Sequence, residues 1–102
     1  MKPDFSITDE IQDELDRQDA RWGEQNHPDG TGLSEDSQIA ERAKALNDYF
    51  VERDTLTWRD ILWEEVAEAF AEKDEDRLRE ELIQIVTLSL EQGGCLVEQS
   101  EL

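Results

Sequence analysis

Two pairs of side chains that carry oxygen ligands stand near the middle of this sequence, and the members of each pair are three residues apart. Glu65 and Glu68 form the first pair, and Glu81 and Gln84 form the second after a gap of twelve residues. Carboxylate and amide oxygens are hard ligands of the kind that Mg²⁺ or Mn²⁺ prefers, and the sequence has no Cys and His set with zinc spacing. The pairs therefore indicate a divalent-cation site, with an ordinary solvated acidic face as the alternative.

Helix geometry is expected to bring the two pairs together. Residues three apart lie within about 60° of each other on a helix, so each pair shares one edge of its helix. The connection over residues 73–75 is short, which makes the two helices antiparallel neighbours whose acidic edges face each other. Like charges placed in this way repel each other unless they are protonated or bridged by a cation.

The sequence predicts four helices and almost no strand. Apolar residues recur at helical spacing in four segments, and each segment begins at a residue whose side chain can cap a helix. The expected helices cover about residues 8–21, 34–53, 57–73 and 75–92, with caps at Thr8, Ser34, Thr57 and Asp74. Thr57 and Asp60 have the spacing of a capping box, and Gly93 and Gly94 are expected to end the last helix.

The fourth of these helices is apolar over most of its circumference between Leu82 and Leu90. Four helices from one chain are too few to cover such a helix on all sides. The predicted fold is therefore all-α, with a four-helix bundle-like protomer that homo-oligomerisation completes. We expect a homodimer or homotetramer and a single domain over residues 1–102.

Charge and length limit what the protein can contact. The chain has 102 residues, and its 28 Asp and Glu against 10 Lys and Arg give a formal charge of -18. Such a charge repels DNA and anionic membranes. The N-terminal residues are acidic where a signal peptide is positive, and no apolar run approaches the roughly 20 residues of a membrane span. With the single Cys95, these features predict a soluble, cytoplasmic protein without nucleic-acid or membrane partners.

Within predicted helices, Glu65-x-x-Glu68 followed by Glu81-x-x-Gln84 resembles the signature of MazG-like nucleoside triphosphate pyrophosphohydrolases, members of the all-α NTP pyrophosphatase superfamily. The resemblance covers roughly residues 58–91. The stretch over residues 18–30 is also similar to the segment that precedes the helices in small MazG-like proteins of phages and actinobacteria. The resemblance implies hydrolysis of a nucleoside triphosphate between the α and β phosphates, which gives a monophosphate and pyrophosphate.

The resemblance also implies a role for each of the paired side chains. Glu65, Glu68 and Glu81 match the ligands that hold Mg²⁺ against the substrate phosphates, whereas Gln84 stands where the family has Asp. An amide brings no negative charge, so the cation is expected to be bound more weakly. Three other acids adjoin these positions. Helix geometry directs Glu64 and Glu80 away from the acidic edge and places Glu72 one turn along the helix. None of the three is assigned, and no catalytic base is identified.

Four further residues are candidates for substrate binding. Arg77 precedes Glu81 by four residues and can contact phosphate, with a simple ion pair to Glu81 as the alternative. Trp22, Gln25 and His27 belong to a loop over residues 22–32 and can contact a nucleobase by stacking and hydrogen bonding. The alternative for this loop is a plain connection that places Trp22 in the core.

Two other classes of function remain open at this stage. The first is a catalytically inactive, acidic MazG-like binding module or a protein that mimics DNA. The second is a helical scaffold without any ligand. The acids are distributed almost evenly along the chain, as is expected for a protein whose whole surface is acidic. A generally acidic surface does not explain the paired spacing of the glutamates. Dependence on a divalent cation separates the enzyme from both alternatives.

Overall fold

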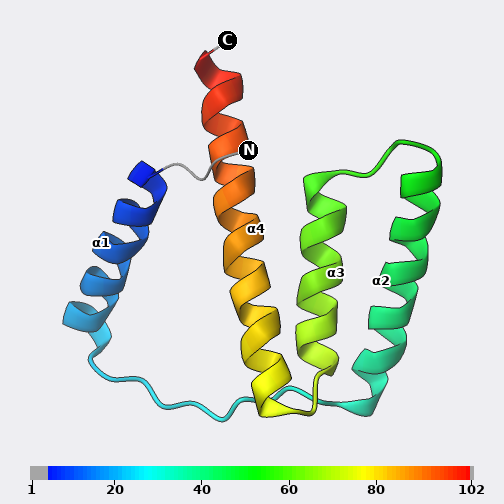
Figure 1. Cartoon of the computed structure of the whole chain (residues 1–102). Helices are drawn as coiled ribbons and strands as arrows, with labels where there is room; N and C mark the ends of the chain where they lie inside the picture. The colour runs from blue at the N-terminus through cyan, green and yellow to red at the C-terminus, as the bar shows by residue number, and fades with distance from the viewer. Residues whose placement is uncertain (1–4, 102) are drawn as a thin grey trace. The chain divides into compact units, whose positions relative to one another are not determined.

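The computed structural model describes the backbone of residues 5–101 and the side chains of residues 7–96. The chain is all-α, with α1 at Phe5–Trp22, α2 at Ser34–Glu52, α3 at Trp58–Ala71 and α4 at Glu75–Glu101 (Figure 1). No strand occurs in the described backbone. Within the same residues, no helix has the length and the apolar character that crossing a membrane requires. The predicted all-α fold class and its four helices are thus confirmed.

Two of the predicted caps are formed by local side chains. The Thr57 hydroxyl accepts a hydrogen bond from the backbone N–H of Asp60 at 3.3 Å, and the Asp60 carboxylate accepts one from the N–H of Thr57 at 3.1 Å. This is the capping box that the spacing predicts. At the start of α4, Asp74 accepts hydrogen bonds from the N–H groups of Asp76 and Arg77. Both helix starts therefore follow from the nearby sequence.

Two expected helix boundaries and one expected cap are wrong. The first helix begins at Phe5, so Thr8 lies inside it. Ser34 is the first residue of α2, after the N-cap Leu33, and its side chain caps nothing. The fourth helix continues through Gly93 and Gly94 to Glu101. A Cβ at Gly93 would meet the tip of the Ile7 side chain, so Ile7 of α1 packs closely against this part of α4.

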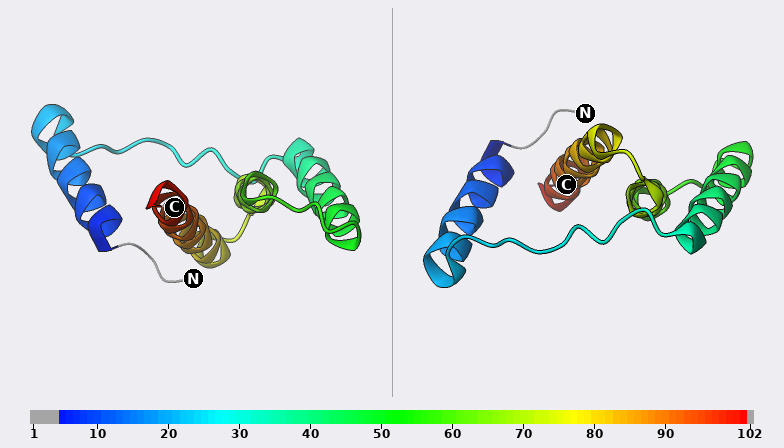
Figure 2. Two further views of the ribbon diagram at one scale, coloured as in Figure 1. Left: turned by 90° about the horizontal axis from the view of Figure 1, so that it is seen from above. Right: turned by 90° about the horizontal axis from the view of Figure 1, so that it is seen from below.

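The described chain divides into two compact units. One contains residues 5–29 and 89–101, and the other contains residues 30–88. The first unit holds α1 and the C-terminal part of α4, where Ile7 meets Gly93. The second unit holds α2, α3 and the start of α4, and α2 and α3 lie side by side in both views of Figure 2. The single domain over residues 1–102 stays a prediction.

Small side chains form the closest part of the α2–α3 packing. Ala43 of α2 and Ala67 of α3 are each 2% exposed, as is expected where two helices approach each other closely. The backbone N–H of Gly32 donates to the carbonyl of Phe70 at 2.8 Å, which fixes the end of the preceding loop to the end of α3. This core is thin, and large apolar side chains elsewhere on the unit stay half-exposed. Homo-oligomerisation stays a prediction.

The two helix starts at Thr57 and Ser34 give a matched test of the capping analysis. Thr57→Ala removes the acceptor for the Asp60 N–H and should lower the free energy of unfolding by about 1 kcal/mol. Ser34→Ala removes no cap and should change it by less than about 0.5 kcal/mol. Urea unfolding followed by circular dichroism measures both values. Equal losses in the two variants would show that the capping box does not stabilise α3.

Candidate metal site

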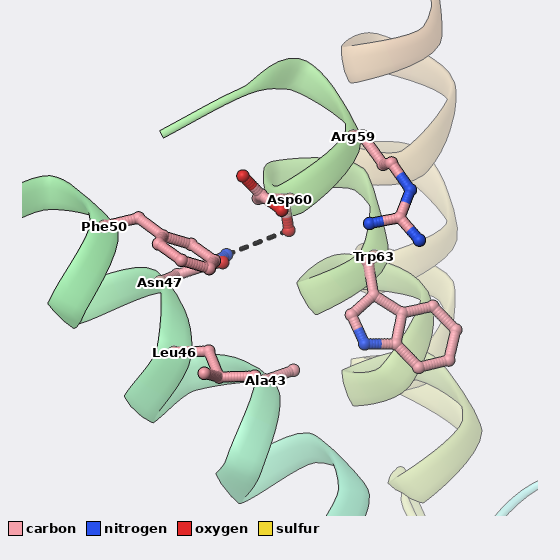
Figure 3. A pocket seen from close by; sticks show the side chains of 7 residues that line it. All are labelled: Ala43, Leu46, Asn47, Phe50, Arg59, Asp60 and Trp63. Carbon is pink, nitrogen blue, oxygen red and sulfur yellow. Dashed lines mark hydrogen bonds between the residues drawn. The ribbon is translucent and has the colours of Figure 1, made fainter. Parts of the chain in front are cut away.

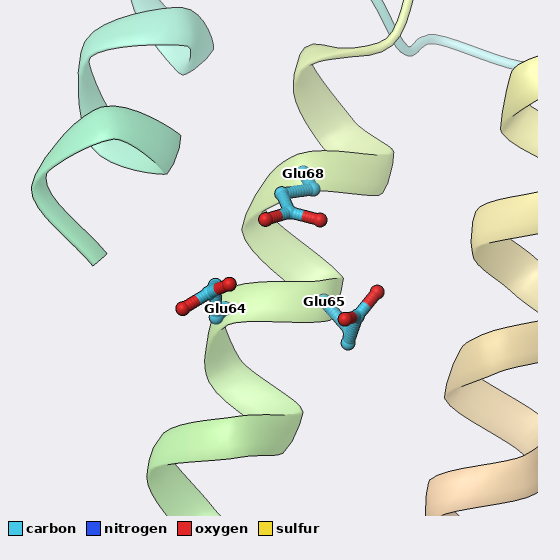
Figure 4. Close-up of side chains that lie close together, drawn as sticks. All are labelled: Glu64, Glu65 and Glu68. Carbon is cyan, nitrogen blue, oxygen red and sulfur yellow. The ribbon is translucent and has the colours of Figure 1, made fainter. Parts of the chain in front are cut away.

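Three glutamates gather on α3, and one carboxylate oxygen from each lies within 4.8 Å of the other two. They are Glu64, Glu65 and Glu68, and all three are half-buried. Figure 4 shows Glu64 on the side of α3 next to α2 and Glu65 on the side next to α4. The i, i+3 and i, i+4 spacings put their carboxylates on one broad face of the helix.

Glu81 of α4 adds a fourth carboxylate to this group. One of its oxygens, Oε2, is buried and accepts no hydrogen bond from any residue that the structure describes. Glu81 is close enough to Glu65 for the two carboxyl groups to share a hydrogen bond when one of them is protonated. We call Glu64, Glu65, Glu68 and Glu81 the acidic cluster.

Protonation of two cluster members is strongly favoured. The pKa of Glu65 is raised to about 7, first because burial disfavours its charged form and then because of the hydrogen bond to Glu81. Burial also raises the pKa of Glu68 to about 7, and a hydrogen bond to Glu64 adds to the rise. Repulsion from neighbouring carboxylates contributes in both cases. The cluster therefore holds protons at pH values where an exposed glutamate has lost its own.

Asn47 of α2 holds Glu64 in place. Its side chain is buried, and the amide nitrogen donates one hydrogen bond to the backbone carbonyl of Asp60 and another to Glu64 Oε1, each at 2.9 Å. Both partners are acceptors, so they determine which end of the amide is the nitrogen. Asn47 thus joins α2 to α3 and fixes the carboxylate of Glu64 beside the other α3 glutamates.

Sequence reasoning placed Glu64 away from the site, and the structure corrects this. A regular helix does direct the Cβ of Glu64 toward α2, but the buried Asn47 receives its carboxylate there. The signal in the sequence was an asparagine on the apolar face of the second predicted helix, one turn after Ala43. A buried amide needs partners, and an acidic side chain on the neighbouring helix is a natural one.

The structure brings three of the four predicted ligands together. Glu65, Glu68 and Glu81 belong to the acidic cluster, whereas Gln84 is exposed. Arg77 is exposed as well, and among the described side chains it forms no ion pair with Glu81. By helix geometry, Arg77 and Gln84 lie within about 60° of Glu81 on α4. They therefore share the side of α4 that carries the cluster glutamate.

The predicted base-binding residues line a hollow in the unit that contains residues 5–29. Trp22, Gln25 and His27 border a space of about 560 Å³, and His27 Nε2 lies 3.2 Å from Gln25 Oε1. Trp22 is 60% exposed, with the guanidinium of Arg21 4.6 Å from the centre of its ring. The alternative that Trp22 is tucked into the core is therefore wrong. Contact of these residues with a nucleobase stays a prediction.

Comparisons of this chain with protein-family models, curated proteins and solved structures find no match. The MazG-like assignment thus receives no support from relatives and stays a prediction. The cation, the substrate and the cytoplasmic location are also predictions. The acidic cluster itself is observed in the structure.

The raised pKa values predict how stability depends on pH. An unfolded glutamate titrates near 4.5, so protons on Glu65 and Glu68 stabilise the fold fully below that pH. This stabilisation is lost as the pH rises through about 7. The free energy of unfolding, measured in urea without divalent cations, should therefore fall between about pH 5 and about pH 8.

Glutamine variants test whether the acidic cluster causes this dependence of stability on pH. Glu65→Gln should flatten the slope, because a neutral amide replaces a carboxyl group that the fold keeps protonated. Glu41→Gln, at an exposed position of α2, should keep the wild-type slope. If both variants show the same slope, the pH dependence arises outside the cluster.

Loss of the Asn47 amide should destabilise the α2–α3 pair. Asn47→Ala leaves Glu64 and the Asp60 carbonyl without their donor, so we expect the free energy of unfolding to fall by about 1–3 kcal/mol. Gln38→Ala, at an exposed site on the same helix, serves as the control and should be close to neutral. Chemical unfolding at about pH 7 compares the two. A near-neutral Asn47→Ala would mean that the buried amide contributes little.

Proposed function

We propose that the acidic cluster binds Mg²⁺ or Mn²⁺ and that the protein is a cation-dependent nucleoside triphosphate pyrophosphohydrolase. One observation carries the proposal. Four carboxylates from α3 and α4 are drawn together, two of them have a pKa raised to about 7, and a buried oxygen of Glu81 lacks a donor. A divalent cation relieves this repulsion above neutral pH, where protons no longer can.

The donor set fits such a cation. All four cluster residues offer carboxylate oxygens, which Mg²⁺ and Mn²⁺ prefer over nitrogen or sulfur. Glu65, Glu68 and Glu81 are the proposed ligands, as the resemblance implies. Glu64 supplies the negative charge that Gln84 does not bring, because Asn47 holds its carboxylate within the same group. The substitution of Gln for Asp at position 84 therefore does not leave the site short of charge.

Mg²⁺ held there would supply charge neutralisation at the phosphate oxygens and activation of the attacking water. The residues of the chain would then have separate tasks. Glu65, Glu68 and Glu81 hold the cation, and Glu64 accepts the proton of the attacking water. Arg77, exposed on the same side of α4 as Glu81, contacts the phosphates of the substrate. Water adds at phosphorus and the bond between the α and β phosphates breaks, giving a nucleoside monophosphate and pyrophosphate.

A catalytically inactive, acidic MazG-like binding module is the second candidate. One observation favours it: Gln84, at the position where the resembled family carries an acidic ligand, is exposed and makes no contribution of charge. In that case the acidic surface binds a basic partner, and the cluster does not turn over a nucleotide whether or not it holds a cation.

Cation binding and pyrophosphate release test the proposal together. Isothermal titration with MgCl₂ and MnCl₂ at about pH 8 should show binding, and Glu65→Gln or Glu64→Gln should weaken it at least about tenfold. Glu41→Gln, which carries the same change of charge far from the cluster, should bind as the wild type does. Pyrophosphate release from a panel of ribo- and deoxynucleoside triphosphates should require the cation and fail in Glu65→Gln.

The outcomes separate the candidates. Binding with release supports the hydrolase. Binding without release, and release only after Gln84→Asp, supports the inactive binding module. No cation binding by the wild-type protein overturns the metal site and the hydrolase, and leaves only an acidic binding module that works without a cation.

A further inference from the structure

The buried amide of Asn47 acts on the acidic cluster from the neighbouring helix. Its nitrogen donates both hydrogen bonds, one to the backbone carbonyl of Asp60 and one to Oε1 of Glu64, each at 2.9 Å. Figure 3 shows the bond to Asp60 as a dashed line between α2 and α3. All three residues belong to the unit over residues 30–88, so the whole arrangement is contained in one compact unit.

The two acceptors of the Asn47 amide differ in how freely they move. The Asp60 carbonyl is part of the backbone of α3 and stays in place as long as that helix is formed. Glu64 has a long side chain that would otherwise sample several rotamers. The bond to the backbone therefore anchors the amide, and the bond to Glu64 passes this order on to the carboxylate.

Glu64 also differs from the other members of the cluster. Among the residues that the structure describes, it is the one cluster carboxylate that accepts a hydrogen bond from a side-chain amide. Glu65 and Glu81 instead share a hydrogen bond with each other, and the partner of Glu68 is Glu64 itself. An amide is neutral, so it orients a carboxylate without pairing its charge as a lysine or an arginine would. A carboxylate held in this way is suited to take a proton.

We propose that Asn47 is a positioning residue for the hydrolysis and holds Glu64 where it can take the proton of the attacking water. This role rests on the proposed function, because it serves the same reaction. In that reaction the water oxygen bonds to phosphorus and the proton of the water passes to a Glu64 oxygen. The electron pair of the broken P–O bond leaves with pyrophosphate. Asn47 touches neither the water nor the substrate and acts through Glu64 alone.

A fixed position matters more for a base than for a cation ligand. The charge of a divalent cation acts over several ångströms and draws a flexible carboxylate into place. A water molecule exerts no comparable pull, so the base must already lie within hydrogen-bond distance of it. Loss of the Asn47 donor should therefore slow the chemical step and leave the affinity for the cation nearly unchanged.

Asn47→Leu tests this separation, because leucine has the branched shape of asparagine but donates no hydrogen bond. Circular dichroism confirms that the helices remain, and isothermal titration with MgCl₂ gives the dissociation constant. Pyrophosphate release at saturating Mg²⁺, from the triphosphate that the wild type hydrolyses fastest, gives kcat and KM. We expect kcat to fall at least about tenfold, and KM and the dissociation constant to stay within about twofold. Gln38→Leu, the same type of exchange at an exposed position of α2, should match the wild type.

Glu64→Asp tests the same role if Asn47→Leu fails to fold. Aspartate keeps the carboxylate but is one methylene shorter, so it cannot reach Asn47 and the attacking water from the wild-type position. We expect kcat to fall at least about tenfold while Mg²⁺ binding is retained, in contrast to Glu64→Gln, which removes charge. Glu41→Asp, at an exposed position of α2, is the matched control and should keep the wild-type kcat.

The outcomes separate this role from the proposed function. Hydrolysis by the wild type that Asn47→Leu and Glu64→Asp leave at full kcat overturns the positioning role alone. A fall in kcat with an equal loss of Mg²⁺ affinity also overturns it, since Asn47 would then serve the cation site or the fold. No cation-dependent release by the wild type overturns the proposed function and, with it, the role of Asn47.

Discussion

The two hydrogen bonds that Asn47 donates are the interaction on which the α2–α3 pair depends. Ala43 and Ala67 allow the helices to approach closely, and this approach buries the amide between them. A buried amide without partners would cost about 1–3 kcal/mol, so the Asp60 carbonyl and Glu64 must remain in position. The register of the two helices and the place of the first cluster glutamate are therefore set by one side chain.

The placement of Glu64 has an electrostatic consequence for the rest of the cluster. Once its carboxylate is held beside Glu68, the nearby Glu65 and Glu81 lie in a region that is both partly desolvated and negative. Protons relieve the repulsion below neutral pH, and a cation is the simplest substitute above it. The cost of this crowding is concentrated on α3, where oxygens of three of the four carboxylates lie within 4.8 Å of one another.

Sequence reasoning succeeded where the cause is local. The capping box of Thr57 and Asp60, the cap at Asp74 and the meeting of Glu65, Glu68 and Glu81 all follow from spacing along one or two neighbouring helices. Sequence reasoning failed where a contact with a residue of another helix is involved. α4 continues through Gly93, where Ile7 of α1 packs against it, and Glu64 belongs to the cluster, where Asn47 of α2 donates a hydrogen bond to it. No pattern within a single helix contains either contact.

The net charge of -18 bears on the proposed cation site at two ranges. Repulsion from acids elsewhere on the surface acts over a distance and is weakened by salt, whereas repulsion within the acidic cluster acts between neighbouring half-buried carboxylates and is screened much less. If the cluster binds a divalent cation as proposed, the cation would remove the short-range repulsion. Its effect on stability should then persist at an ionic strength that cancels the influence of the general acidity of the chain.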